Sequence, residues 1–364
     1  MAEQAIISER EAKILGIIET ARGKRAKFRD ERITMAHGAG GKATQSLIEG
    51  LFLPAFGGAA LGQMSDSGEV VVDGVTLALT TDSYVVKPLR FPGGSIGDLA
   101  VNGTVNDLAV SGAHPLALSL SLVLEEGLPA DQLRAEVDTI ALAARAAGVE
   151  IVTGDTKVVE RGHADGMYIC TTGLGRRDPR ASLAPSNIRP GDRILLSGSI
   201  GEHGMAIMLA RGEFELDAAI ESDTACLWPA VDALLDAAGP GLRCLRDATR
   251  GGVASVLNEL ARSSSVAMLV REAAIPVHAA VAGAAEILGI DPMYVANEGK
   301  LVAFVAPDSA DAALEALRAV RGCDQAVEIG EVCTEPPGMV LVETSFGGRR
   351  VMDQLVGDPL PRIC

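Results

Sequence analysis

Aromatic residues are scarce in this sequence, where Phe, Trp and Tyr make up 3% of 364 residues. A buried core must therefore be assembled from Ala, Val, Leu and Ile, which dominate the 48% hydrophobic content. Long apolar runs are lacking too, because no stretch reaches the ~20 residues that a transmembrane helix requires. Charged residues interrupt the first positions of the chain, so we expect neither a membrane span nor a signal peptide. These absences predict a protein without a membrane partner.

Positive charge is also in short supply. The chain has 32 Lys and Arg against 48 Asp and Glu, which gives a formal net charge of -16. Without a basic run or basic residues interleaved with aromatics, the sequence predicts no nucleic-acid partner. An acidic protein can still bind ATP when Mg²⁺ neutralises part of the phosphate charge.

Cysteine pairs at metal-binding spacing are lacking as well. The 6 cysteines are scattered and none forms a Cys-x-x-Cys pair, which argues against a zinc site. Scattered thiols in a chain of this length are more typical of a reduced compartment than of a disulfide framework. We therefore expect a cytoplasmic protein.

What the sequence does have is glycine, with 41 residues, and alternating strand and helix patterns. Apolar spacing predicts helices at 96–113 and 130–149 and a strand at 75–82. The alternation predicts an α/β or α+β class, and the length predicts two domains at ~100–200 residues each. The proline-rich segment between them is the best boundary. The predicted organisation is an extension at 1–32, a domain at 33–175, a linker at 176–192, a second domain at 193–345 and a mobile tail at 346–364.

Acidic residues stand at several predicted strand or helix ends, among Gly, Ser and Thr. A carboxylate in such a place can bind a hard cation, and small neighbours let a triphosphate approach the backbone. The alternative is that each of them caps a helix or fills a turn. Asp107 is the sharpest case, because it lies inside an apolar helical pattern where a charge needs a partner. The set is Asp66, Asp82, Asp107, Asp155 and Asp247.

The glycine-rich segment HGAGGK at 37–42 could hold phosphate with its backbone N–H groups, with Lys42 adding charge. It is not a Walker A loop, and a glycine-rich loop is a weak signal by itself. Lys157 follows TGDT and Glu298 lies in NEGK. Each of these two could equally be an ordinary surface charge.

The last residue of the sequence is Cys364. An inert thiol on a frayed end is one interpretation, and a carrier thiol on a swinging arm is the other. The terminal carboxylate should raise the pKa of this thiol whereas Arg362 should lower it, so its reactivity stays open.

Together these motifs closely resemble the HypE family of [NiFe]-hydrogenase maturation proteins, which are carbamoyl dehydratases of the aminoimidazole-ribonucleotide-synthetase-like (PurM-like) superfamily. The resemblance runs in order over about residues 33–364, and residues 1–30 extend beyond the usual start of the family. The superfamily shares the TTD, ND, GDT and D-x-T-x-G-G elements, whereas the terminal PRIC points to HypE. The matching segments are HGAGGK, LTTDSYVVKPLRFPGGSIGDLAVNGTVNDLAVSGAHP, VTGDTKVV, RDATRGGVASVLNELA, NEGK and PRIC.

The resemblance implies a two-domain PurM-like fold, an N-terminal domain whose sheet forms a homodimer, and ATP with Mg²⁺ bound between domains of that assembly. It implies Cys364, Lys157 and Glu298 as catalytic residues. It implies Asp66, Asp82, Asp107 and Asp155 as metal residues. The nucleotide residues would be Gly38, Gly40, Gly41, Lys42, Asp66, Asp82, Asn106, Asp107, Asp155, Thr156 and Asp247. HGAGGK would be a flexible loop over the nucleotide.

The resemblance further implies a reaction and its partners. HypF would transfer a carbamoyl group to Cys364, ATP-dependent dehydration would turn the thiocarbamate into a thiocyanate, and the cyanide would pass to iron on a HypC–HypD complex. Two alternatives remain at this point. One is another ATP-using relative, such as a selenophosphate synthetase or a small-molecule kinase, and the other is a non-catalytic maturation scaffold.

Overall fold

The computed structural model describes residues 28–57, 65–212, 218–355, 360 and 362–364. Most of the extension predicted at 1–32 lies outside these residues. The described part of the chain contains two β-sheets of five and seven strands and a small two-stranded sheet, with helices packed against them. This mixture of helix and strand confirms the predicted α/β (α+β) class. No helix among the described residues is long and apolar enough to cross a membrane.

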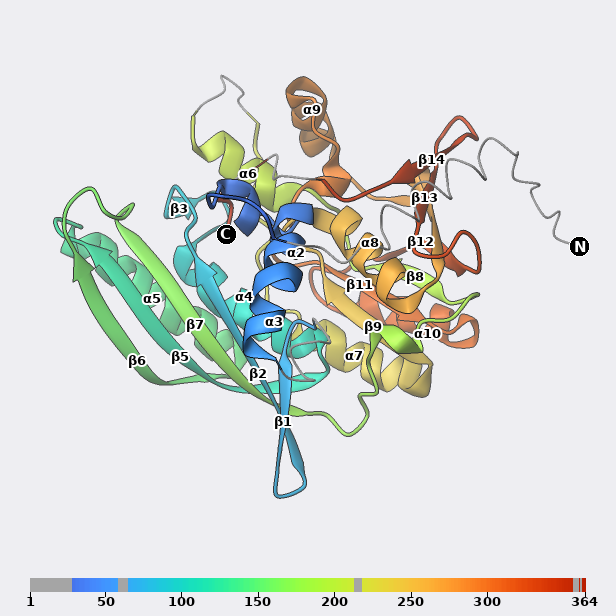
Figure 1. Ribbon diagram of the computed structural model, residues 1–364, viewed down its shortest axis with the longest axis horizontal. Helices are drawn as coiled ribbons and strands as arrows, with labels where there is room; N and C mark the ends of the chain where they lie inside the picture. Colours follow the sequence, from blue (N-terminus) through green and yellow to red (C-terminus); the bar gives the residue numbers. More distant parts are fainter. Residues whose placement is uncertain (1–27, 58–64, 213–217, 356–359, 361) are drawn as a thin grey trace, which may run out of the picture.

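The five-stranded sheet is formed by the N-terminal half, in the order β1-β2-β7-β5-β6. Only β5 and β6 pair in parallel, and the other pairs are antiparallel. Figure 1 shows this curved sheet on the left of the molecule. The strands are β1 (Gly68–Val72), β2 (Val75–Tyr84), β5 (Ala113–Glu125), β6 (Glu150–Val159) and β7 (Met167–Arg177), with β3 (Arg90–Phe91) and β4 (Gly94–Ser95) forming the small sheet.

One face of this sheet is covered by α4 (Ile96–Val110) and α5 (Ala130–Ala147), which confirms both predicted helices. Along β7 the side chains alternate between buried and half-buried, as expected when only one face of a sheet is covered. The opposite face and the edge strand β6 are exposed. Ser95 caps α4 by accepting a hydrogen bond from the Gly97 backbone N–H at 3.1 Å.

The N-terminal helical segment lies over the junction of the two halves in Figure 1. It consists of four short pieces that come one after another: η1 (Met35–Gly38), α2 (Lys42–Leu47), the π-helical η2 (Ile48–Phe52) and α3 (Leu53–Phe56).

The seven-stranded sheet belongs to the C-terminal half, in the order β14-β13-β10-β12-β8-β11-β9. It is mostly antiparallel, with β10 and β13 the parallel pair. Two apolar clusters lie on its two faces, one around α8 and the other around α7 and α10. The strands are β8 (Arg193–Leu196), β9 (Leu242–Asp247), β10 (Ala267–Arg271), β11 (Leu301–Val305), β12 (Val327–Cys333), β13 (Val340–Glu343) and β14 (Arg349–Met352).

The helices of this half are α6 (Glu202–Ala210), α7 (Trp228–Ala238), α8 (Gly252–Ser264), α9 (Ala279–Leu288) and α10 (Pro307–Ala319), with 3-10 turns η4 (Pro185–Asn187), η5 (Gly239–Gly241), η6 (Glu272–Ala274) and η7 (Pro292–Tyr294).

The end of the chain corrects one expectation, because strand β14 lies inside the segment predicted as a tail at 346–364. It pairs antiparallel with β13 after a turn at Gly347, whose φ is +79°. Four residues are too short for an alternation to stand out in the sequence.

Candidate active site

A cavity of about 930 Å³ lies where the two halves meet, and its walls come from both. The N-terminal half contributes the glycine loop, the start of β1, strand β2 and helix α4. The C-terminal half contributes the end of β9, helix α8 and the last residue of the chain. Among the lining residues are Gly40, Gly41, Asp66, Asp82, Tyr84, Asp107, Arg246, Asp247, Arg250, Glu298 and Cys364.

Three carboxylates converge in this cavity. Oxygens of Asp66, Asp107 and Asp247 all lie within 4.8 Å of one another, although the residues come from the β1 approach, α4 and the end of β9. Hard divalent cations such as Mg²⁺ prefer clustered carboxylate oxygens. The donor set therefore fits a divalent cation. The sequence-predicted metal set overlaps with it at two residues, Asp66 and Asp107.

The pKa values of these carboxyl groups are raised because the groups are buried close to one another. Burial, together with the charges of Asp82, Asp247 and Asp66, raises the pKa of Asp107 well above its usual value. Burial and the charge of Asp66 raise the pKa of Asp247 to about 8. Like charges this close destabilise one another, so a bound cation would lower the free energy of the ionised cluster.

Asp82 lies in β2 beside this cluster and accepts a hydrogen bond from the Tyr84 hydroxyl at 3.3 Å. The same hydroxyl lies 3.3 Å from Thr104 Oγ1 on α4. A Cβ atom at Gly103 would collide with it, so this helical glycine is what lets Tyr84 approach. Asp82 thus lines the cavity, and its metal and nucleotide roles stay predictions.

Two arginines at the site were not singled out from the sequence. Arg246 forms a short ion pair with Asp66, and both side chains are largely buried. Arg250 lines the cavity, and the negative charge at Cys364 is the first cause of its raised pKa. They flank Asp247 in RDATRGG. These basic residues on both sides of Asp247, a predicted nucleotide-binding carboxylate, are the feature of the sequence that could have predicted their place at the site.

Glu298 is brought to the cavity by the loop before β11. Glu298 is only 3% exposed to solvent. Burial, then the charges of Asp247, Asp223 and Asp82, raise its pKa well above the ordinary value for a glutamate. A buried carboxyl group with a raised pKa is suited to proton transfer near neutral pH.

Cys364 also lines the cavity, so the structure brings the C-terminus to the carboxylates. Each of the last three residues accepts a hydrogen bond through a main-chain oxygen. Arg211 donates to the Arg362 carbonyl at 2.7 Å, and His203 to the Ile363 carbonyl at 2.7 Å. The backbone N–H of Val85 donates to a main-chain oxygen of Cys364 at 3.0 Å. Leu360 and Ile363 are buried in the apolar cluster that contains α6.

The glycine segment divides between the cavity and its surroundings. Gly40 and Gly41 line the cavity. Gly38 lies behind it, where its carbonyl accepts a hydrogen bond from Arg250 at 2.9 Å. Lys42 is exposed and pairs with Asp353 at 2.9 Å, so its charge does not face the cavity.

Asn106 is fully buried and joins the two halves. Its side-chain amide donates to the carbonyls of Ala225 and Glu298, at 2.9 and 3.2 Å, and its side-chain oxygen accepts from the Leu227 N–H at 2.8 Å. It is not among the residues that line the cavity. In this structure its hydrogen bonds hold the halves together.

The three predicted residues of the TGDTK segment lie elsewhere. Asp155, Thr156 and Lys157 are exposed on the edge strand β6, where Lys157 pairs with Asp155 at 2.7 Å. This pair lowers the pKa of Asp155. A second, shallow hollow of about 450 Å³ runs along β5 and β6 and includes Asp155 and Thr156. Within one chain the structure does not bring these residues to the acidic cavity.

Comparison with known proteins matches each half of the chain to a known domain family. The AIR synthase related protein N-terminal domain matches residues 65–177, and the corresponding C-terminal domain matches residues 189–342. Carbamoyl dehydratase HypE of Rhodobacter capsulatus is 49% identical over 93% of this chain and 99% of its own length. A HypE structure in complex with ATP is 44% identical, with a TM-score of 0.77, and covers 92% of this chain and 100% of that one. The structure of a HypE–HypF complex gives a TM-score of 0.81 at 44% identity, covering 85% and 99%.

Proposed function

Because this chain belongs to the HypE carbamoyl dehydratases of the AIR synthase related family, we propose that its cavity binds ATP and that Cys364 carries the group to be dehydrated. The chain is thus an enzyme of hydrogenase maturation. The observation that carries the assignment of roles is the shared cavity, in which Cys364, Glu298 and three converging carboxylates are found together.

The proposed reaction converts the thiocarbamate on Cys364 into a thiocyanate. ATP supplies a γ-phosphoryl group that turns the carbamoyl oxygen into a phosphate leaving group. The carbon–oxygen bond then breaks, the nitrogen loses its two protons, and the products are ADP, phosphate and the S-cyano group. Cys364 keeps the carbon covalently attached throughout. The cyanide would then become a ligand of hydrogenase iron.

Glu298 is the proposed base. It lies in the same cavity as Cys364, and its raised pKa would make the ionised carboxylate a stronger proton acceptor than an ordinary glutamate. Its burial would also keep water from the activated group, which water would otherwise hydrolyse.

We propose Asp66, Asp107 and Asp247 as the nearest candidates to hold Mg²⁺, with Asp82 beside them. The fit rests on the 4.8 Å convergence of their oxygens. Mg²⁺ usually binds through a few carboxylates together with substrate phosphates. Gly40 and Gly41 would hold the phosphates through the backbone.

A homodimer is proposed for the open face of the five-stranded sheet. This sheet, with its edge strand β6 and the β1–β2 hairpin, exposes many aliphatic side chains. The exposed residues are Val70, Val71, Val72, Val75, Leu79, Leu116, Ile151, Val152 and Val158. Large exposed apolar patches mark interaction surfaces. In a dimer through this face, Asp155, Thr156 and Lys157 of one chain would be available to the cavity of the other, which would reconcile their exposure with the proposed roles.

HypF is the proposed carbamoyl donor, supported by the similarity to a HypE protein solved in complex with HypF. We propose that a HypC–HypD complex accepts the cyanide. A cytoplasmic location is proposed as well, supported by 6 cysteines that are thiols rather than disulfides, as expected of a reducing compartment.

Mass spectrometry tests the carrier assignment. After incubation with HypF, carbamoyl phosphate and ATP, the terminal peptide should first gain about 43 Da and then retain about 25 Da, the difference being one water. Cys364→Ala should gain neither mass, whereas the half-buried Cys333→Ser serves as the matched control and should behave as the parent does. Adducts on another cysteine would contradict the assignment and reopen the alternatives of a kinase-like relative or a scaffold.

A further inference from the structure

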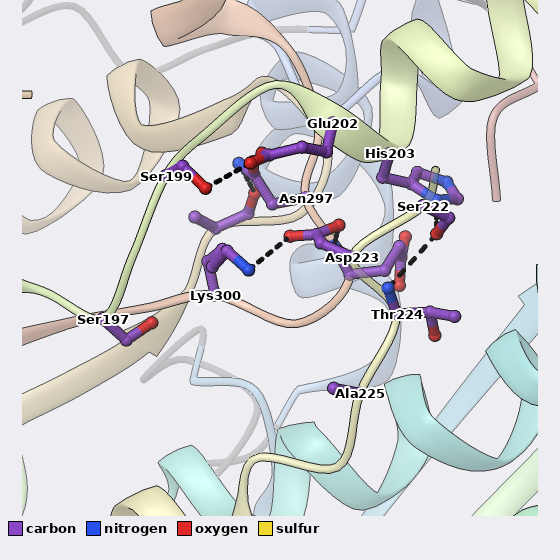
Figure 2. A network of polar contacts seen from close by, with 12 residues as sticks. Ser197, Ser199, Glu202, His203, Ser222, Asp223, Thr224, Ala225, Asn297 and Lys300 are labelled. Carbon is purple, nitrogen blue, oxygen red and sulfur yellow. Dashed lines mark hydrogen bonds and ion pairs between the residues drawn. The ribbon is translucent and has the colours of Figure 1, made fainter. Parts of the chain in front are cut away.

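A buried polar chain connects the C-terminal tail to the loop that carries Glu298. Figure 2 shows its central segment, 222–225, running between His203 on α6 and the residues Asn297 and Lys300. The residues in this network all lie outside the strands of the two sheets. The network is of interest because one of its ends contacts Ile363, the residue before Cys364, and its other end contacts Glu298.

The tail end begins at His203, which is fully buried. Its Nε2 lies 2.7 Å from the Ile363 carbonyl. Because a carbonyl can only accept, this nitrogen must carry the hydrogen. Burial lowers the pKa of His203, so the ring is neutral and its Nδ1 accepts from the Ser222 hydroxyl at 2.8 Å. The Ser222 oxygen in turn accepts from the Thr224 N–H at 3.2 Å, which leaves a single consistent direction for every hydrogen bond.

The loop end begins at the next residue, Asp223, whose side chain is 4% exposed. One carboxylate oxygen accepts a hydrogen bond from the backbone N–H of Glu298 at 3.0 Å. The other oxygen lies 3.6 Å from the ammonium group of Lys300. Because a buried carboxylate needs these partners, Asp223 and the loop at 298–300 must move together or lose them.

The backbone reinforces this link. The Ala225 N–H donates to the Glu298 carbonyl at 3.4 Å. A Cβ atom at Gly299 would collide with the Asp223 carbonyl oxygen, so the two segments lie in direct contact. Glu298 is therefore held by the 222–225 segment on both its N–H and its carbonyl side.

We propose that His203 and Ser222 couple docking of the tail to the placement of Glu298, and that Asp223 is the positioning residue that transmits this coupling. When Ile363 is docked, His203 holds Ser222, and the adjoining Asp223 holds the Glu298 backbone. When the tail leaves, His203 loses its acceptor, and the restraint on the 222–225 segment weakens. The base would then be in place only while the thiol is in the cavity.

This inference rests on the proposed roles of Cys364 and Glu298, but its first test does not. Coupling is reciprocal, so a change at the Glu298 end must alter tail docking. The alkylation rate of Cys364, measured by mass spectrometry of the terminal peptide in the full-length chain, reports tail docking without any catalytic step. Ser222→Ala and Asp223→Ala should both raise this rate, by about three- to tenfold for the loss of one hydrogen bond.

Asp223→Ala is the decisive variant, because the Asp223 carboxylate binds the Glu298 loop rather than the tail. His203→Gln tests the other end, since its amide can still donate to the Ile363 carbonyl; it should stay closer to the parent than His203→Ala does. His278→Ala is the matched control, because His278 is half exposed and pairs with Glu202 instead. It should leave the alkylation rate unchanged. An unchanged rate in folded Asp223→Ala would overturn the coupling.

The second readout is the single-turnover dehydration of the carbamoylated chain. Asp223→Ala should slow it by about tenfold at saturating ATP, with ATP affinity unchanged, whereas Asp223→Asn should recover part of the rate because it keeps an acceptor for the Glu298 N–H. The double variant with His203→Ala should be less impaired than the sum of the single effects predicts. Strict additivity would overturn the coupling. If the parent chain makes no thiocyanate, the proposed function fails, while the alkylation result still decides the coupling.

Discussion

Replacing Asp247 by Asn should make the cation-free protein more stable while weakening its response to Mg²⁺. Asp247 is 6% exposed and lies in a group of like charges, where burial and Asp66 raise its pKa from 3.8 to about 8. An acid with a higher pKa in the folded protein than in the unfolded chain stabilises the fold when it is protonated. That stabilisation is complete below the unfolded pKa and is lost as the pH rises through the folded one.

The magnitude depends on the size of the shift. Each pKa unit corresponds to about 1.4 kcal/mol, so a shift of roughly four units sets an upper limit of about 6 kcal/mol above pH 8. Protonation of neighbouring carboxylates and entry of water relieve part of the repulsion. We therefore expect Asp247→Asn to gain about 2–3 kcal/mol in the free energy of unfolding at pH 8, and little at pH 4.

Denaturant unfolding at several pH values, with divalent cations chelated, measures this difference. The gain of the variant should grow between about pH 5 and pH 8. Adding Mg²⁺ and ATP should stabilise the parent by mass action and stabilise the variant much less. Asp324→Asn, at an exposed position, is the control and should change neither quantity. A gain that is independent of pH, or a variant less stable than the parent at pH 8, would refute the electrostatic argument.

Three further predictions concern the frame of the site. Arg246→Met should lower the free energy of unfolding by about 3 kcal/mol, because it leaves Asp66 buried without its partner; a loss below about 1 kcal/mol in denaturant unfolding would contradict this. Val152→Asp should convert the proposed dimer into monomers in sedimentation experiments, whereas the equally exposed Ile287→Asp on α9 should not; a dimer that survives the first change places the interface elsewhere. Asn106→Ala removes three hydrogen bonds between the halves and should cost about 2–3 kcal/mol in thermal unfolding, so an unchanged melting temperature would exclude its joining role.

Local pattern was sufficient to predict the elements that carry the site. Helix α4 shows why: its apolar residues have helical spacing, and the charge of Asp107 inside that pattern called for a partner. The partner is the Thr80 hydroxyl, at 2.7 Å, together with the rest of the cavity. Strand β2 was predictable for the same reason, since its run of β-branched residues ends in polar ones. A charge out of place in an apolar pattern was therefore the most informative feature of the sequence.

The spacing of residues in the sequence could not predict which of these elements meet at the cavity. Arg246 and Asp66 are far apart in the sequence and meet only because the fold brings β9 and the approach to β1 together at one cavity. Lys42 is the opposite case: its place after a glycine loop suggested phosphate binding, whereas in the structure it pairs with Asp353, a residue far away in the sequence. The roles of Asp155 and Lys157 stay predictions, because a single chain leaves them exposed on β6.

The charge of the cavity should couple the binding of a cation, the binding of ATP and the docking of the tail. More acidic than basic side chains line the cavity; the acidic ones include Asp66, Asp82, Asp107, Asp247 and Glu298, and the basic ones include Arg246 and Arg250. The terminal carboxylate of the docked chain and a triphosphate would each add negative charge to it. A divalent cation at the converging carboxylates would relieve the repulsion among them and would also offset the charge of the phosphates. ATP should therefore bind this cavity only together with its cation, and the tail should dock more firmly once that cation is present.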